Sequence, residues 1–357
     1  MSDLRSELAL HLEGNRDALA REAMDLQYGR HTGLAERYSP AQKAYSLRDA
    51  GTNLAYLLEA AAAGSPGLFA DYARWLHSLL KGYGLPDDDL VIHFFCLGEV
   101  LREKLPGDLW AAVAPCLEAA LADLKNAPAA PAPFIGEGDG PLAGLARLYL
   151  DALLKGDRRR ARDLVIASAD GGTDLRALYM DVFQRSQREI GRLWQMNKVS
   201  VAQEHYCTAA TQLIMSELYP RLFRTDKTGK VLVAACVGGE LHELGIRMVS
   251  DFLEMEGWDT YYLGANTPQS SVVQTLEDRR ADVLAISATI TYHVDKVASL
   301  VKAVRERPAL NRVRVMVGGY PFNVDPDLWR KVGADGSSLD ASHAVADVGR
   351  LLGGSPA

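Results

Sequence analysis

The amino-acid sequence predicts an α + α/β protein, in which helical bundles precede an open parallel β-sheet. Two observations lead to this fold class. Residues 1–125 and 142–223 carry apolar side chains at helical spacing. From Lys230 onward, by contrast, short apolar runs alternate with helical stretches. That alternation is typical of a parallel sheet with helices on both faces.

Composition limits the classes of function. A chain of 357 residues that is 48% hydrophobic can bury two or three cores. Its net charge of -7 argues against direct binding of nucleic acid or anionic membranes. Residues 1–15 are polar and no apolar run is long enough to cross a bilayer, so we expect a cytoplasmic protein without a signal peptide. The scattered cysteines, which form no CxxC pair, are expected to be reduced core residues: Cys96, Cys116, Cys207 and Cys236.

Residues 1–125 are predicted to form an N-terminal helical bundle. Apolar residues recur at helical spacing in Leu54–Leu58, Leu68–Leu80 and Leu90–Leu105. The acidic run Asp87–Asp89 suits a helix N-terminus, because acids interact favourably with the positive end of the helix dipole.

Residues 126–141 (NAPAAPAPFIGEGDGP) are rich in Pro, Ala and Gly and are expected to be a linker. Residues 142–224 should then form a four-helix bundle with short connections. Ser200-Val-Ala-Gln203 is a capping box, so a helix is expected to begin at Val201. The expected helices are 142–155, 157–169, 173–194 and 201–222.

Residues 230–354 are predicted to form the α/β domain. Its expected strands are 231–236, 259–263, 283–287 and 313–317, with a fifth short strand closed by Gly333–Gly336 and a last helix at 341–352. Ligands of an open parallel sheet bind outside the carboxyl ends of its strands. Hydroxyls and paired glycines follow the strands there, and they offer hydrogen bonds and close backbone approach to a large ligand.

The loop after the first strand carries His242, the only histidine of the three stretches Gly238–Gly245, Ser287–Thr289 and Gly318–Pro321. Glu240, two residues earlier, could accept a ring proton and so fix the tautomer of the imidazole. The alternative interpretation is an ordinary surface histidine in a glycine-rich loop. A single histidine cannot hold a bare zinc ion, which requires three or four protein ligands. It can bind a metal that arrives already ligated by a macrocycle.

Four short motifs together resemble the cobalamin-binding module of methionine synthase, corrinoid shuttle proteins and mutases. They are Glu240-Leu-His-Glu-Leu-Gly245, Ser287-Ala-Thr289, Gly318-Gly319 and Gly333-Ala-Asp-Gly336. The family motif is Asp-x-His-x-x-Gly, then Ser-x-Leu or Ser-x-Thr, then Gly-Gly, so Glu240 stands where Asp is usual.

The resemblance implies a flavodoxin-like (Rossmann-type) cobalamin domain with His242 as the lower cobalt ligand. His242 would displace the dimethylbenzimidazole of the cofactor. The nucleotide tail would then enter a slot beside Ser287, Thr289, Gly318 and Gly319. Further cofactor-binding residues expected around this site are Glu240, Leu241, Glu243, Gly245, Tyr320 and Gly336.

Trp194 is followed ten positions later by Glu204-His205. This Trp-x9-Glu-His pattern resembles the cap of CarH-type photoreceptors, which bind adenosylcobalamin in the dark. The resemblance implies that Trp194 packs over the adenosyl group and that Glu204 and His205 line the upper face. Without it, Trp194 would be a core residue and Glu204 a partner of the helix dipole. The chain departs from that family in lacking a DNA-binding segment and in carrying Gln195 where a histidine is usual.

The N-terminal bundle resembles photocobilins, cobalamin sensors thought to hold a bilin as well. Leu68–Leu76 and Leu90–Phe95 are the stripes that carry this resemblance, and such stripes are equally typical of helix cores. The resemblance implies a noncovalently bound biliverdin, since no cysteine lies in an attachment motif. Its polar anchors would be Tyr72, Arg74, His77 and His93.

These features together predict a light sensor rather than an enzyme. Photolysis of the cobalt–carbon bond of adenosylcobalamin would empty the space under Trp194, and the cap would repack to fill it. The signal would pass to a downstream partner or through a homo-oligomer, expected to be a dimer. The alternative is a corrinoid methyl carrier that serves separate methyltransferases. A mutase subunit would need a substrate barrel from a partner, and a degenerate interaction protein would bind no cobalamin.

Overall fold

The computed structural model of the chain describes residues 2–126, 130–136, 138, 140–223 and 225–353, with only the backbone of residues 2 and 3. The chain divides into two compact units, Met1–Ala129 and Ala130–Ala357. The expected linker at 126–141 lies partly outside the described residues, as do the expected domain ends at 224 and 354.

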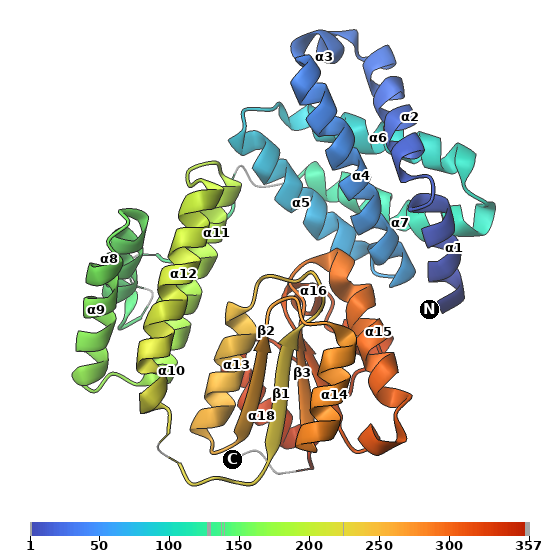
Figure 1. Cartoon of the computed structure of the whole chain (residues 1–357). Helices are drawn as coiled ribbons and strands as arrows, with labels where there is room; N and C mark the ends of the chain where they lie inside the picture. Colours follow the sequence, from blue (N-terminus) through green and yellow to red (C-terminus); the bar gives the residue numbers. More distant parts are fainter. Residues whose placement is uncertain (1, 127–129, 137, 139, 224, 354–357) are drawn as a thin grey trace. The chain divides into compact units, whose positions relative to one another are not determined.

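The first unit is helical, as predicted (Figure 1). Ser39 starts its longest described helix with a capping box, in which its hydroxyl accepts from the Gln42 amide and the Gln42 side chain accepts from the Ser39 amide. Its best-packed helix pairs are α5 with α7, and α2 with α4 and α6. The helices are α1 (Ser2–Leu12), α2 (Arg16–Arg30), α3 (Thr32–Arg37), α4 (Pro40–Ala62), α5 (Pro66–Gly82), α6 (Asp87–Lys104) and α7 (Gly107–Leu124).

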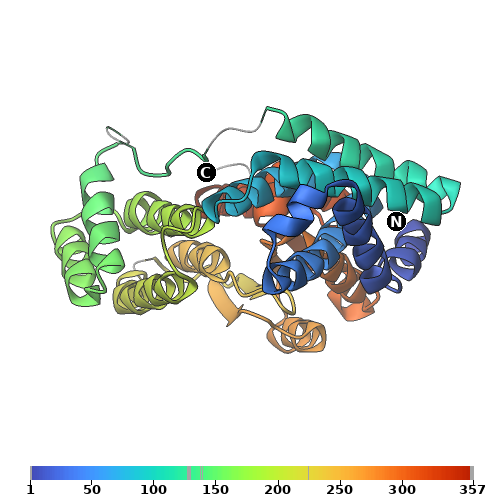
Figure 2. The same ribbon diagram turned by 90° about the horizontal axis from the view of Figure 1, so that it is seen from above.

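The second unit begins with the cap helices, where α8 lies beside α9 and α11 beside α12 (Figures 1 and 2). The capping box at Ser200 is present as predicted. The third expected helix starts at Leu175 rather than 173, because the preceding Gly172 turns the chain with a positive φ of 89°. It also contains a π-helical segment that the sequence did not indicate. The elements are α8 (Ala143–Leu154), α9 (Arg158–Asp170), α10 (Leu175–Ala177), the π-helical η1 (Leu178–Gln184), α11 (Arg185–Gln195), α12 (Val201–Leu218) and the 3-10 helix η2 (Tyr219–Arg221).

The α/β part confirms the predicted flavodoxin-like sheet. Within the described residues it has five parallel strands in the order β2-β1-β3-β4-β5. The strands are β1 (Val231–Cys236), β2 (Asp259–Gly264), β3 (Val283–Ser287), β4 (Arg314–Gly318) and β5 (Gly336–Ser338). The helices are α13 (Leu244–Met255), α14 (Gln269–Arg279), α15 (Val294–Arg305), α16 (Tyr320–Val324), α17 (Leu328–Lys331) and α18 (Ala341–Leu351), with 3-10 turns η3 (Thr291–His293) and η4 (Pro308–Leu310).

The fifth strand is displaced from its expected position. Gly333 has a φ of 80° and follows the short helix α17, so the run that was expected to close the strand is the turn before it. Asp335 fastens this turn, since its Oδ2 accepts from the Val315 amide at 2.6 Å. Strand β5 therefore starts at Gly336 and its carboxyl end is Ser338.

Apolar packing holds the described part of this unit together. Helices α13 and α18 pack against one another over one face of the sheet, while α14 packs beside α15. The core of the cap includes fully buried Tyr149, Tyr179 and Phe183, and it continues into Met248 and Phe252 of α13. The cap thus packs on the α/β domain through the outer side of α13.

Candidate functional site

The carboxyl ends of four strands meet in one row of the sheet. Cys236 of β1 pairs with Ser287 of β3, Ser287 with Gly318 of β4, and Gly318 with Ser338 of β5. The loops that follow these strands therefore lie at a single edge, where a ligand of an open parallel sheet is expected.

Large apolar side chains are exposed at this edge. In the described part of the α/β domain, the exposed large hydrophobic residues are Leu241, Tyr292, Tyr320 and Leu339. Each follows a different strand of that row. Grouped exposed apolar side chains mark a surface that a ligand or partner covers. Tyr292 and Leu339 were missed by sequence reasoning, and their signal is a bulky apolar residue within five positions of a strand end.

His242 lies in the loop between β1 and α13 with its side chain 58% exposed. Its Nδ1 donates a hydrogen bond to Glu240 Oε1 at 2.5 Å, and its backbone amide donates to the same oxygen at 3.0 Å. Among the described residues, no partner is found for Nε2, the nitrogen on the far side of the ring. Because Nδ1 carries the proton, Nε2 has a free lone pair with which to bind a metal.

Glu240 is fully buried, yet it is saturated with donors. Its second oxygen, Oε2, accepts from the amides of Thr289 at 2.7 Å and Ile290 at 3.2 Å, and from Nδ1 of His293 at 3.1 Å. Burial alone would raise the pKa of Glu240, but the hydrogen bonds from His242, His293 and the backbone outweigh it and hold that pKa far below its ordinary value. Glu240 is therefore an anion that orients His242.

The hydrogen bond to this anion raises the pKa of His242, although burial opposes the change. His293 was not anticipated from the sequence. It is 3% exposed in the turn after β3, and it lies 53 positions from the glutamate that it contacts. No spacing rule connects the two residues, because the parallel sheet brings their loops together.

Ser287 and Thr289 offer hydroxyls beside this cluster. In the described chain neither hydroxyl has a hydrogen-bond partner, so both are free to bind a ligand. Gly319 comes next at the end of β4 with a φ of 104°. A Cβ there would lie 2.0 Å from the Ala288 carbonyl oxygen, so only glycine is tolerated. Gly318 is half-buried at the same edge.

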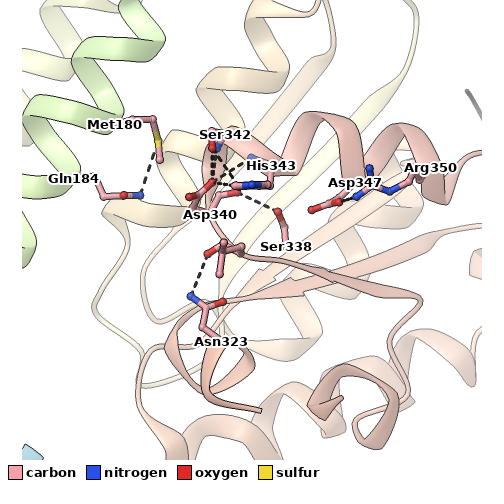
Figure 3. A network of polar contacts seen from close by, with 10 residues as sticks. Met180, Gln184, Asn323, Ser338, Asp340, Ser342, His343, Asp347 and Arg350 are labelled. Atoms are coloured by element: carbon pink, nitrogen blue, oxygen red, sulfur yellow. Dashed lines mark hydrogen bonds and ion pairs between the residues drawn. The ribbon is translucent and has the colours of Figure 1, made fainter. Parts of the chain in front are cut away.

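The loop after β5 contains a network of polar contacts around Asp340 (Figure 3). Asp340 caps α18, with Oδ1 accepting from the amides of Ser342 at 2.9 Å and His343 at 3.1 Å. Burial would raise the pKa of Asp340, but these bonds and those from the two side chains lower it. Asn323 Nδ2 donates to the Leu339 carbonyl at 3.1 Å, which fixes that exposed leucine in place (Figure 3).

The structure places the other three residues predicted to bind the cofactor in different environments. Gly245 lies in the first turn of α13, where a Cβ would meet no atom within 4 Å. Gly336 lies two residues before the strand end and packs against Leu351. The carboxylate of Glu243 is already occupied by protein donors from Gln212, Tyr262 and the Ala265 amide.

The cap brings Trp194 and the Glu204-His205 pair to neighbouring helix ends. Trp194 is half-buried next to the last residue of α11, and Gln195 is buried. Glu204 Oε1 accepts from the Thr208 hydroxyl at 3.0 Å, and Oε2 accepts from His205 Nδ1 at 2.5 Å. The side chain of His205 is 75% exposed, so this pair does not form a sealed pocket within the described protein.

The four expected bilin anchors of the first unit all have protein partners. Tyr72 donates to Asn53 at 2.6 Å, and Arg74 pairs with Asp71 and Asp123. His77 pairs with Asp87, and His93 Nδ1 contacts Gln27 at 3.1 Å. Burial lowers the pKa of His93 to about 4, so it is neutral near pH 7.

Other structural findings bear on cofactor chemistry. In the described residues no group of three or more His, Cys, Asp or Glu side chains could hold a metal ion by itself. All four cysteines are buried and free. No helix in the described part of the chain has both the length and the apolar character of a membrane span. The exposed Nε2 of His242 can bind a metal whose other ligands come from a bound molecule.

Comparison with known proteins agrees with this geometry. Residues 230–348 match a B12 binding domain family, and residues 145–219 match a second B12 binding domain family. Dimethylamine corrinoid protein 2 of Methanosarcina acetivorans is 32% identical over 41% of this chain, which spans 65% of that relative. Dimethylamine corrinoid protein 1 of the same organism is 27% identical over 54% of this chain and 91% of its own length.

The solved monomethylamine corrinoid protein of Methanosarcina barkeri shares the fold. It matches with a TM-score of 0.54 at 19% identity, covering 59% of this chain and all of that one. The chain is therefore a B12-binding protein with cap helices and a Rossmann-like domain. The named relatives are corrinoid proteins, and none of those described is a photoreceptor.

Proposed function

We propose that this chain is a corrinoid methyl carrier, which holds cobalamin at the carboxyl edge of its sheet and serves separate methyltransferases. The observation that carries the proposal is the similarity to dimethylamine corrinoid protein 1, which extends over 91% of that relative. The chain would not itself be an enzyme, because a carrier leaves activation and acceptance of the methyl group to its partners.

The residues at the edge fit the cofactor. His242 Nε2 would bind cobalt from below, and Glu240 would keep the imidazole in the required tautomer. Leu241, Tyr292 and Tyr320 would contact the apolar surface of the corrin. The free hydroxyls of Ser287 and Thr289, with Gly318 and Gly319, would line the slot for the nucleotide tail. A corrinoid held there would supply the cobalt centre that carries the methyl group.

The exposure of the cap residues also supports a carrier. A partner methyltransferase would have to pass the cap to reach a bound corrinoid, and the side chain of His205 is 75% exposed while that of Glu204 is 30% exposed. Trp194 is half-buried rather than enclosed. Because these cap side chains are accessible to solvent, a partner protein could also approach them.

A light sensor binding adenosylcobalamin is the second candidate. The observation in its favour is that Trp194 lies at the end of α11 and Glu204-His205 in the first turns of α12. Unit Met1–Ala129 would then serve as a sensor or dimerisation module. Its four candidate bilin anchors have protein partners, so biliverdin binding would require those contacts to rearrange.

One experiment separates the two functions. The apoprotein is titrated with methylcobalamin and with adenosylcobalamin, and absorption and oligomeric state are recorded before and after green illumination. A carrier is expected to bind methylcobalamin at least as tightly as adenosylcobalamin and to keep its assembly state in light. Strong preference for adenosylcobalamin with a light-dependent change of assembly would replace the carrier by the sensor. Failure to bind either form would exclude both.

A further inference from the structure

One side of α13 carries polar residues that bind the cap at every turn. Glu243 precedes the helix, and Arg247 and Asp251 follow at intervals of four residues. Arg247 donates to the carbonyl oxygen of Gln212 at 3.2 Å and to the hydroxyl of Ser216 at 2.9 Å. Asp251 accepts from the Tyr179 hydroxyl at 2.8 Å. This spacing places all three on one face of the helix.

Glu243 is the member of this row that borders the proposed cobalt ligand, because it follows His242 directly in the chain. Its Oε1 accepts from Gln212 Nε2 at 2.6 Å. Its Oε2 accepts from the Tyr262 hydroxyl at 2.7 Å and from the Ala265 amide at 2.9 Å. One carboxylate thus joins the cap helix α12 to strand β2 and to the loop that carries His242.

The donors to Glu243 come from both the α/β domain and the cap. Tyr262 and Ala265 belong to the α/β domain, so their bonds to Glu243 survive any movement of the cap. In the described structure, Gln212 supplies the side-chain bond from the cap to Glu243. A shift of α12 away from α13 would therefore free Oε1 and leave Oε2 bound, and the carboxylate would reorient one peptide away from His242.

We propose that Glu243 is a positioning residue rather than a cofactor contact, and that its bond with Gln212 makes the hold of His242 on cobalt depend on the position of the cap. This inference rests on the proposed corrinoid binding and on His242 as the lower ligand. A docked cap supports the loop and favours coordination. A displaced cap, as during access by a partner methyltransferase, loosens the lower ligand while the upper side is open.

The experiment uses the full chain labelled with 15N-histidine and loaded with cob(II)alamin. Electron paramagnetic resonance then distinguishes three states, because an axial 15N nitrogen splits each cobalt line into a doublet. The base of the cofactor, at natural abundance, gives a triplet, and an absent axial nitrogen gives unsplit lines. The measured quantity is the ratio of doublet to unsplit signal.

The variants are chosen to isolate one bond. Gln212→Leu removes the donor to Glu243 and keeps a side chain of similar size. Gln212→Lys keeps a donor within reach of the carboxylate. Ser216→Ala is the matched control, since it removes a contact between the same two helices that involves Arg247 and not Glu243.

Gln212→Leu is expected to lower the ratio about tenfold, the effect of one lost hydrogen bond to a charged acceptor, while Gln212→Lys and Ser216→Ala stay near the unsubstituted protein. Equal ratios in all four proteins, or equal losses in Gln212→Leu and Ser216→Ala, would overturn the inference. A triplet or unsplit spectrum in the unsubstituted protein would instead reject His242 as the lower ligand, which is a failure of the proposed function.

Discussion

The binding edge depends on single residues whose roles differ although their neighbours in sequence look alike. Gly319 and Gly245 both belong to the motifs that predicted the site. Gly319 has a φ of 104° and no room for a Cβ beside the Ala288 carbonyl, whereas Gly245 has an ordinary helical conformation and open space. The first glycine is required by the fold. The fold does not require the second glycine, so a requirement for it would have to come from a bound ligand.

Substituting these two glycines should separate the fold from the site. Gly319→Ala is expected to lower the free energy of unfolding by at least about 2 kcal/mol, because of the backbone clash and the left-handed φ. Gly245→Ala should stabilise the apoprotein by about 0.5 kcal/mol, since alanine favours helix. Urea denaturation of the apoproteins measures both. If the space at Gly245 belongs to the cofactor, the same variant should bind cobalamin more weakly.

His293 provides a second prediction about single residues. It is buried and donates to the far oxygen of Glu240, so removing it leaves that carboxylate with one donor fewer and weakens its hold on His242. His293→Phe is expected to lower the affinity for hydroxocobalamin about tenfold, within the range seen when partners of metal ligands are removed. His293→Gln, which keeps a donor, serves as the control.

Absorption titration with hydroxocobalamin reports both the affinity and the coordination of these His293 variants. Unchanged affinity in the phenylalanine variant would show that the amides of Thr289 and Ile290 suffice to hold Glu240.

Whole elements were predictable where the period of apolar residues changed. The strand at 231–236 was placed correctly because Gly229 and Lys230 precede its apolar run and Gly238 and Gly239 follow it after one residue. The π-helical segment at 178–184 had no such signal, since its apolar spacing is close to that of an α-helix. His293 was missed for a related reason. It lies in a short 3-10 turn whose place beside Glu240 follows from strand order alone.

The contact between α13 and the π-helical segment should make stability depend on pH. Burial raises the pKa of Asp251 from 3.8 to about 6, although its bond from Tyr179 opposes the shift. Between these pH values the folded protein binds more protons than the unfolded chain, so stability falls as pH rises. The corresponding loss is about 3 kcal/mol from below pH 4 to above pH 6.

Asp251→Asn removes this titrating group. The difference in unfolding free energy between variant and unsubstituted protein is expected to shift in favour of the variant as pH rises from 4 to 7, as measured by urea denaturation. Asp278→Asn on α14 is the control, because that aspartate is exposed and accepts a hydrogen bond from Gln274 Nε2 at 2.8 Å. A difference that is constant with pH would show that Asp251 titrates normally.

The division of the chain into Met1–Ala129 and Ala130–Ala357 has a consequence for the whole molecule. Every residue that we assign to the corrinoid lies in the second unit. A ligand stabilises only the unit that binds it, by about 2.7 kcal/mol when its concentration is 100 times Kd. Calorimetry of the full chain should therefore show two transitions, of which only one moves to higher temperature when cobalamin is added.

His93 identifies which transition belongs to the first unit. Its pKa is lowered to about 4 by burial, so in the window below its unfolded value of 6.5 the unfolded chain binds more protons than the folded one. Stability of that unit should fall as pH drops from 6.5 toward 4. The transition whose midpoint temperature decreases on acidification should therefore be the one that cobalamin does not change. If cobalamin raises both transitions, the cofactor must also stabilise the first unit. That result would favour the sensor, in which both units respond to the corrinoid, over a carrier whose N-terminal unit is independent of it.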